Sequence, residues 1–232
     1  MSLEAGETLK QRAQRVHQAL LRRFGEPSWR MPLPPLDELV STILSQNTND
    51  GNRDRAFESL RRHFPTWEAV RDAPTQQVVE AIRSAGLAQQ KAPRIQAVLR
   101  AIAQERGRLE LDFLRQWDTP QAQSWLQKFK GVGPKTASIV LLFSLGKDAF
   151  PVDTHIHRVT RRLGLIPQRA SAEQAHTLLA RIFEPASYAA AHLNLIRLGR
   201  EICQARKPKC EICPLQGECD FYQNSAAATD SP

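Results

Sequence analysis

Apolar side chains recur at intervals of three and four residues along most of the chain, which is the spacing of one face of a helix. In residues 8–24 arginine and glutamine occupy the opposite face, and the apolar stripe consists of Leu9, Ala13, Val16, Leu20, Leu21 and Phe24. The pattern predicts helices at 8–24, 38–46, 50–63, 66–71, 75–84, 89–105, 119–129, 134–145, 154–163, 171–183 and 187–202. No segment alternates apolar and polar residues as a strand does, so the sequence predicts an all-α fold.

Glycine, proline and short polar residues separate the expected helices. Gly25–Pro27 ends the first helix, and the proline-rich stretch Met31–Pro35 is predicted to be a linker because proline does not fit a helix interior. Asp37 and Thr75 are expected to cap the helices that follow them. From Gln223 onward the residues are small or polar, and we expect a disordered tail over 223–232.

The composition indicates a polyanionic partner. The chain has 232 residues, a net charge of +8 and a pI of about 9.7. This balance favours nucleic acid, with an ordinary soluble basic protein as the alternative. No apolar run approaches the roughly 20 residues of a membrane span, and residues 1–16 lack the apolar core of a secretory signal. We therefore expect a cytoplasmic protein that associates with chromosomal DNA.

Residues 126–137 have the pattern of a helix, a tight turn and a second helix. Gly131 and Gly133 permit backbone angles that other residues avoid, and they allow another backbone to approach closely. Pro134 suits the first position of a helix, and Val132 is expected to pack inward. The amides of the turn and the positive end of the helix dipole could bind one phosphate. Such a hairpin also occurs as a DNA-backbone anchor with no catalytic role.

Two residues at expected helix starts carry candidate chemistry. Lys135 lies at the positive end of a helix dipole, which favours the neutral amine that Schiff-base chemistry requires. The alternative is a surface lysine that contacts a phosphate. Asp153 precedes Thr154–Ile156, where an aspartate ordinarily caps a helix. The interval between the lysine and the aspartate accommodates one helix and a return loop.

All four cysteines lie in one short segment near the C-terminus: Cys203, Cys210, Cys213 and Cys219. Their spacing is C-x6-C-x2-C-x5-C. In a reducing cytosol such a cluster indicates metal binding rather than disulfides. Four thiolates suit a structural zinc ion, although the long first gap is unlike usual zinc ribbons.

The segments Gly131–Ala137 and Val152–Val159 together resemble the helix–hairpin–helix DNA glycosylases, specifically the endonuclease III family. The likeness covers about residues 8–222. In that family the lysine that matches Lys135 is the nucleophile, and the aspartate that matches Asp153 is the second catalytic residue. The cysteine spacing matches the four ligands of the family's [4Fe–4S] cluster, since four thiolates on a wrapped loop can reach the corners of a cubane.

The resemblance implies two helical lobes with a DNA-binding cleft between them. One lobe is expected to be a six-helix barrel over residues 37–148 that contains the hairpin. The other is expected to join residues 1–36 to 149–222 and to hold the cluster.

The resemblance also implies residues that contact DNA: Gln46, Asn47, Leu87, Gly131, Val132, Gly133, His155, Arg206, Lys207 and Lys209. Two positions depart from the family. Asn47 replaces a glutamine and reaches one methylene less far, and Ala88–Gln89 replace tyrosine and asparagine. The alternatives are a polar helix end for Gln46 and Asn47, a buried loop anchor for Leu87 and a helix-start histidine for His155.

The function implied is a bifunctional DNA glycosylase and abasic-site lyase that removes oxidised pyrimidines from double-stranded DNA as a monomer. A monofunctional adenine- or thymine-mismatch glycosylase is an alternative, although Lys135 argues against it. A non-catalytic DNA-binding module and a redox role for the cluster are two further alternatives.

Overall fold

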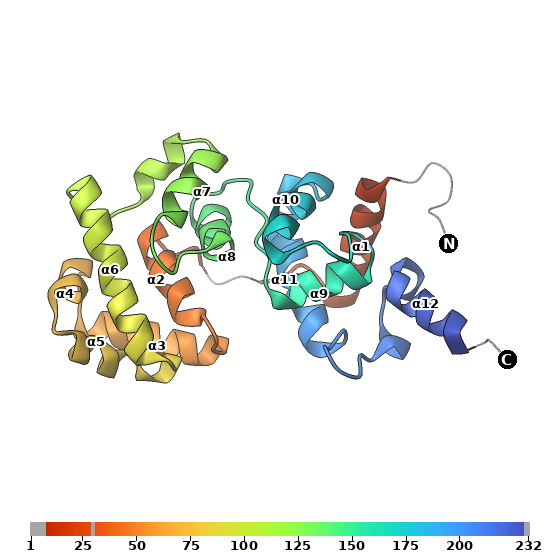
Figure 1. The fold of residues 1–232 in the computed structure, drawn as a ribbon, viewed down its shortest axis with the longest axis horizontal. Coiled ribbons are helices and arrows are strands. Elements are labelled where there is room, and N and C mark those ends of the chain that lie inside the picture. The colour runs from red at the N-terminus through yellow and green to blue at the C-terminus, as the bar shows by residue number, and fades with distance from the viewer. Residues whose placement is uncertain (1–7, 29–30, 230–232) are drawn as a thin grey trace. The chain divides into compact units, whose positions relative to one another are not determined.

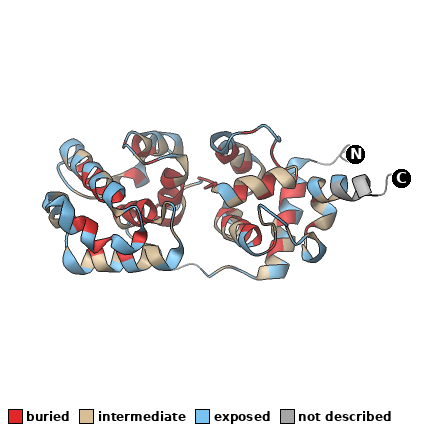
Figure 2. Cartoon of the chain, turned by 60° about the horizontal axis from the view of Figure 1, so that its bottom comes forward, coloured by how far each residue is buried: buried red, intermediate tan, exposed pale blue. Residues whose placement is uncertain are grey.

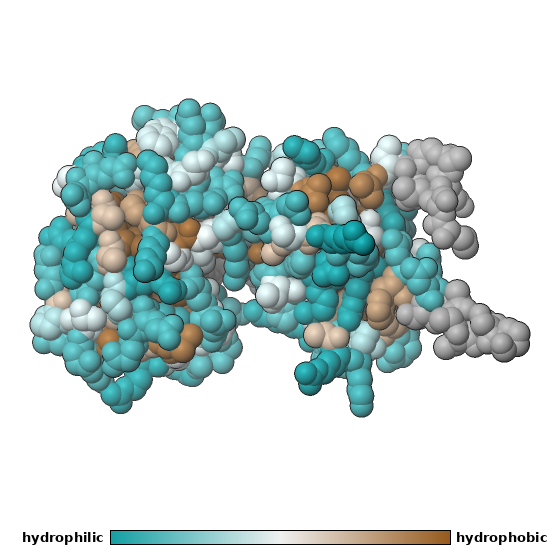
Figure 3. Space-filling view, viewed as in Figure 1, coloured by the Kyte–Doolittle hydropathy of each residue, from teal (hydrophilic) through white to brown (hydrophobic). Residues whose placement is uncertain are grey.

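The computed structural model describes residues 8–28 and 31–229, with side chains described up to residue 224. The expectations that concern residues 1–7, 29–30 and 230–232 lie outside this part. All regular secondary structure in the described ranges is helical, which confirms the all-α prediction (Figure 1). The surface in Figure 3 is largely hydrophilic, with small apolar areas. No described helix is both long enough and apolar enough to cross a bilayer.

The chain divides into two compact units. One contains Met31–Lys147, and the other combines residues up to 30 with Asp148–Pro232. Buried residues gather inside each unit (Figure 2).

The unit formed by residues 31–147 is built around one central helix, α2 (Pro35–Ser45). Its residues Leu39, Val40, Ile43 and Leu44 form an apolar stripe at helical spacing and are fully buried. It packs against α3, α6 and α8. The elements of this unit after α2 are α3 (Asp50–His63), α4 (Trp67–Asp72), α5 (Thr75–Ala81), the 3-10 turn η1 (Arg83–Ala85), α6 (Ala88–Arg106), the 3-10 turn η2 (Asp112–Gln116), α7 (Thr119–Gln127), α8 (Pro134–Ile139) and the π-helical η3 (Val140–Ser144).

The other unit packs α11 (Tyr188–Glu201) against both α1 (Leu9–Phe24) and α9 (Thr154–Arg162). The buried face of α1 includes Ala13, Val16 and Leu20, which belong to the stripe expected from the sequence. The remaining elements are α10 (Ala172–Ile182), η4 (Pro185–Ser187), η5 (Cys210–Ile212), η6 (Gln216–Glu218) and α12 (Asp220–Thr229).

The helix caps predicted at Asp37 and Thr75 were wrong. Helix α2 begins at Pro35, inside the expected linker, because proline fits the first position of a helix. Asp37 is therefore inside the helix, where it accepts a hydrogen bond from Trp67 Nε1 at 2.8 Å. Thr75 is the first residue of α5, and its hydroxyl donates to Gln96 Oε1 at 2.7 Å. Both side chains therefore bond to a residue distant in sequence and do not cap their own helix.

The expectation of a disordered tail needs correction over residues 223–229. Helix α12 continues through these residues to Thr229. Asp220 in the first turn complements the helix dipole, and alanines 226–228 have high helix propensity. These local preferences outweigh the lack of large apolar residues.

Candidate functional site

The glycine turn connects α7 to α8, and only one of its two glycines adopts a backbone conformation that favours glycine. Gly131 has φ of +91°, a region that favours glycine, whereas Gly133 is extended at φ −90° and ψ −179°. Val132 is 4% exposed, and its amide donates to the Phe129 carbonyl at 2.9 Å. Pro134 occupies the first turn of α8. The turn is therefore anchored by one inward side chain and leaves Gly133 exposed.

A side chain, rather than another backbone, approaches Gly131 closely. A Cβ atom on Gly131 would lie 2.2 Å from Arg94 Cδ. Arg94 also donates to Gln46 Oε1 at 2.7 Å, and Gln46 Nε2 donates to the Gly131 carbonyl at 3.1 Å. Gln46 at the end of α2 and Arg94 on α6 thus both contact the glycine turn and support it. Arg94 was not among the predicted site residues, because no local sequence pattern marks this contact.

Lys135 is the second residue of α8 and is half-buried. Its neighbours Thr136, Ala137 and Ser138 are buried, which fixes the helix in the core of its unit. Within residues 31–147, Lys135 makes no hydrogen bond or ion pair. The helix therefore fixes the backbone position of Lys135, and no partner within residues 31–147 engages its amine.

The predicted DNA-contacting loops contain unusual backbone conformations. Among the described residues other than glycine, positive φ values occur at Asn47 (+53°), Leu87 (+51°) and Lys207 (+49°). All three had been predicted to contact DNA on other grounds. Left-handed backbone at such residues is uncommon and gathers at functional sites. Leu87 is also 49% exposed, which excludes its alternative role as a buried loop anchor.

Asp153 caps α9, as the ordinary interpretation of its position predicts. Its Oδ1 accepts a hydrogen bond from the Ile156 amide at 2.8 Å. Within its own unit the described residues provide no donor to Oδ2. Asp153 is half-buried, so one oxygen orients the side chain and the other remains available for chemistry.

His155, two residues after the cap, is fixed by Arg158. Arg158 donates to His155 Nδ1 at 3.2 Å, and it also donates to the carbonyls of Gly199 at 2.8 Å and Cys203 at 3.0 Å. Because Nδ1 accepts, the neutral imidazole carries its proton on Nε2. Arg158 therefore links the start of α9 to the loop that follows α11.

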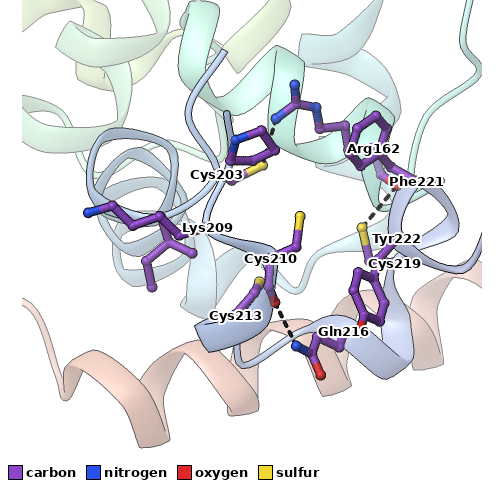
Figure 4. Close-up of a pocket in the computed structure, with 11 residues that line it drawn as sticks. Arg162, Cys203, Lys209, Cys210, Cys213, Gln216, Cys219, Phe221 and Tyr222 are labelled. Carbon is purple, nitrogen blue, oxygen red and sulfur yellow. Dashed lines mark hydrogen bonds between the residues drawn. The ribbon is translucent and has the colours of Figure 1, made fainter. Parts of the chain in front are cut away.

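That loop carries the four cysteines, which lie around one pocket (Figure 4). Arg162 donates to Cys203 Sγ at 3.3 Å and to the Gln204 carbonyl at 2.7 Å. Gln216 Nε2 donates to the Cys210 carbonyl at 2.6 Å. The loop is thus held in shape by hydrogen bonds at several points around the pocket.

The positions of the thiols fit a [4Fe–4S] cluster. All four cysteines line the same pocket, so four thiolates could reach the corners of one cluster there. Burial raises the pKa of Cys213 to about 11 and also raises the pKa values of Cys210 and Cys219. Without bound metal these thiols stay protonated, so metal binding must displace their protons.

The first gap of the cysteine loop presents cations to solvent. Arg206, Lys207 and Lys209 are all exposed. Arg206 and Lys207 do not line the pocket, whereas Lys209 also borders it. This loop therefore combines a metal-binding inner face with a basic outer face.

Two family models match the chain. Residues 40–185 match the HhH-GPD superfamily of base excision DNA repair proteins, and residues 203–219 match the iron–sulfur binding domain of endonuclease III. The second match begins at Cys203 and ends at Cys219, which are the first and last cysteines.

Relatives support the same family. Endonuclease III of Thermotoga maritima is 32% identical over 88% of this chain and 90% of the relative. A sequence of Arabidopsis thaliana named as a candidate DNA glycosylase is 39% identical over 80% of this chain and 67% of its own length.

Solved structures extend the likeness to the fold. A trapped covalent intermediate of endonuclease III with DNA has a TM-score of 0.80 and 27% identity, and it covers 95% of this chain and 100% of that chain. A thermostable thymine-DNA glycosylase shares the fold with a TM-score of 0.79 at 19% identity, covering 94% of this chain and 100% of that chain.

These matches confirm that the protein is a DNA-binding DNA glycosylase of base excision repair and that it carries a [4Fe–4S] cluster. The chain belongs to the HhH-GPD superfamily and, within it, to the endonuclease III family.

Proposed function

We propose that the protein is a bifunctional DNA glycosylase and abasic-site lyase that acts on oxidised pyrimidines in double-stranded DNA. The observation that carries this proposal is the position of Lys135. It is a half-buried lysine in the first turn of α8, next to the glycine turn, and no partner in its unit engages it. A lysine amine without such a partner is available for nucleophilic attack on a sugar carbon.

The first chemical step replaces the damaged base with the lysine. The damaged nucleotide must leave the base stack, which costs least for a lesion that pairs or stacks poorly. The lone pair of Lys135 Nζ forms a bond to C1′ while the bond from C1′ to the base nitrogen breaks. The base leaves with that electron pair and takes up a proton, and the attached nitrogen loses one.

Asp153 is proposed to assist this exchange. Its Oδ1 is held by the Ile156 amide, so Oδ2 is the oxygen that stabilises positive charge on the sugar and relays protons. Opening of the C1′–O4′ bond, with protonation of O4′, then gives a Schiff base between C1′ and the Lys135 nitrogen.

The Schiff base leads to strand cleavage on the 3′ side. It acidifies C2′, and loss of a C2′ proton provides the electron pair that expels the 3′ phosphate as the C3′–O3′ bond breaks. Water then hydrolyses the C1′=N bond and returns the free amine of Lys135. An enzyme that used water in place of lysine would leave the strand intact.

We further propose the four cysteines as the cluster ligands. When bound, the [4Fe–4S] cluster cross-links residues 203–219 and so fixes the loop that bears Arg206, Lys207 and Lys209. These cations would contact DNA phosphates. Asn47, Leu87 and His155 would contact the nucleotides around the lesion, and the turn Gly131–Gly133 the phosphate backbone.

Borohydride trapping tests the mechanism. The protein is incubated with a duplex that contains one thymine glycol or one abasic site, borohydride is added, and a denaturing gel is examined for a covalent complex. Lys135→Gln should abolish the complex. Lys130→Gln is the matched control, because Lys130 is an exposed lysine in the same hairpin and its loss should leave trapping intact.

Each other outcome of this experiment indicates a different function. Base release without trapping would indicate a monofunctional glycosylase. Equal binding of damaged and intact DNA, with neither trapping nor release, would indicate a DNA-binding module. We also propose a monomer that works in the cytoplasm on chromosomal DNA, and sedimentation of the protein with and without DNA tests the monomer.

A further inference from the structure

Lys91, on α6, is a buried lysine that the proposed chemistry does not use. Its side chain is 1% exposed. The ammonium donates to the Leu44 carbonyl at 2.7 Å and to the Ala85 carbonyl at 2.8 Å. Within residues 31–147 no carboxylate pairs with it. Within this unit, the described residues therefore stabilise the charge through two backbone carbonyls.

These two carbonyls lie at the bases of two DNA-contacting loops. Leu44 is in the last turn of α2, three residues before Asn47. Ala85 ends η1, two residues before Leu87. The backbone amide of Lys91 also donates to the Leu87 carbonyl at 3.0 Å. One residue thus contacts the supports of both the Asn47 loop (residues 45–49) and the Leu87 loop (residues 85–88).

Both loops present a side chain outward from a left-handed backbone. Asn47 is exposed at φ +53°, and Leu87 is 49% exposed at φ +51°. Such conformations cost on the order of 1 kcal/mol or more each, and they persist where surrounding contacts enforce them. The hydrogen bonds from the Lys91 side chain to the Leu44 and Ala85 carbonyls supply such contacts beside both loops.

The burial of Lys91 is itself unfavourable. Removal from water and repulsion by Arg94 lower its pKa to about 8. A methionine would fill similar space without burying a charge. The contribution of the lysine therefore lies in the carbonyls that it holds, since an apolar side chain cannot bond to them.

We propose that Lys91 is a positioning residue that holds the Asn47 loop and the Leu87 loop at a fixed separation, so that both side chains enter the duplex together when a damaged nucleotide leaves the stack. The inference rests on the proposed function for its consequence in DNA, but the constraint on the loops belongs to the protein without DNA.

Gln96 provides a matched control on the same helix. It is fully buried, and its Nε2 donates to the carbonyls of Val70 at 3.0 Å and Ala73 at 2.8 Å. Gln96→Met therefore also removes a buried polar side chain that holds two carbonyls, but these carbonyls lie in and after α4, outside both loops.

Amide hydrogen exchange of the cluster-loaded protein without DNA is the first test. In Lys91→Met, we expect exchange at residues 45–49 and 85–88 to accelerate about tenfold, as expected for lost hydrogen bonds at the loop bases. In Gln96→Met, acceleration should centre on residues 70–75. Equal loop protection in wild type and Lys91→Met would overturn the proposal. Should Lys91→Met not fold, Lys91→Gln takes its place with the same criterion.

Base extrusion is the second test, with 2-aminopurine placed next to a thymine glycol in the duplex. Lys91→Met should reduce the fluorescence change about tenfold relative to Gln96→Met, with affinity for intact duplex within about twofold of wild type. Equal changes in the two variants would overturn the proposal. A wild-type protein that gives no fluorescence change would instead contradict the proposed function, and hydrogen exchange would still decide the role of Lys91.

Discussion

The side-chain amide of Gln46 donates a hydrogen bond to the Gly131 carbonyl at 3.1 Å, across 85 residues of sequence. The oxygen of the same amide accepts from Arg94 at 2.7 Å. Both polar atoms of the Gln46 amide are thus hydrogen-bonded to residues of the glycine turn or beside it. Of the two adjacent polar residues predicted to enter DNA, Asn47 is the exposed one.

Gln46→Ala should weaken the turn that precedes Lys135. We expect a loss of about 1 kcal/mol in the free energy of unfolding and a several-fold slower borohydride trapping, because the position of α8 becomes less defined. Single-turnover trapping on an abasic-site duplex measures the rate. Affinity for intact DNA should change little. A large loss of affinity with an unchanged trapping rate would show instead that Gln46 contacts DNA directly.

Gly131→Ala should destabilise the protein by roughly 1–3 kcal/mol. The new Cβ would lie 2.2 Å from Arg94 Cδ, and alanine is strained at φ +91°. Gly133→Ala is the control, since no atom lies within 4 Å of its Cβ position and its φ is −90°. Denaturant unfolding of both variants gives the comparison. Equal losses would mean that the contact with Arg94 does not constrain the turn.

Asn47→Gln should raise the rate of base removal for lesions opposite a large purine, because the longer side chain reaches further into the space left by the extruded nucleotide. Asparagine tolerates the left-handed backbone at φ +53° better than glutamine does, so a small loss of thermal stability should accompany the gain. Single-turnover glycosylase assays with adenine or guanine opposite the lesion test this. An unchanged or lower rate would refute the idea.

Lys91 should make the stability of the protein depend on pH above 8. Burial lowers its pKa from 10.5 to about 8, so between these values the unfolded chain binds more protons than the folded one. The wild type should therefore gain stability relative to Lys91→Met as pH rises from about 8 to 10.5, by at most about 3 kcal/mol. Unfolding of both proteins across this range, compared as a difference, measures the effect. A constant difference would show that Lys91 titrates normally.

Cys203→Ser should remove the brown absorbance of the cluster and destabilise the cysteine loop. The change also removes the sulfur that accepts a hydrogen bond from Arg162 at 3.3 Å. Iron analysis and the visible spectrum report cluster loss, and limited proteolysis within residues 203–219 reports the loop. A colourless wild-type protein with bound zinc would overturn the assignment of the cluster.

The sequence by itself determined the helical class, most helix positions and the residues whose side chains can take part in catalysis or metal binding. Each of these depends on neighbours along the chain. Helical periodicity fixes which face is buried, the glycines mark the turn before Lys135, and the cysteine spacing marks one metal-binding loop. The differences between expected and observed helices also have local causes. Helix α2 begins at Pro35, earlier than expected, and the alanine-rich residues after Gln223 are helical.

Only the tertiary structure decided what holds the candidate site in place. Arg94 meets Gly131 and Gln46, Lys91 meets Leu44 and Ala85, and Arg158 connects His155 to the Cys203 carbonyl. Lys91 can be recognised in the sequence as a charged residue on the apolar stripe of α6. Its two partners could not be identified from the sequence, because every residue has a backbone carbonyl. Whether a carbonyl is free to accept another hydrogen bond depends on where each helix ends in space.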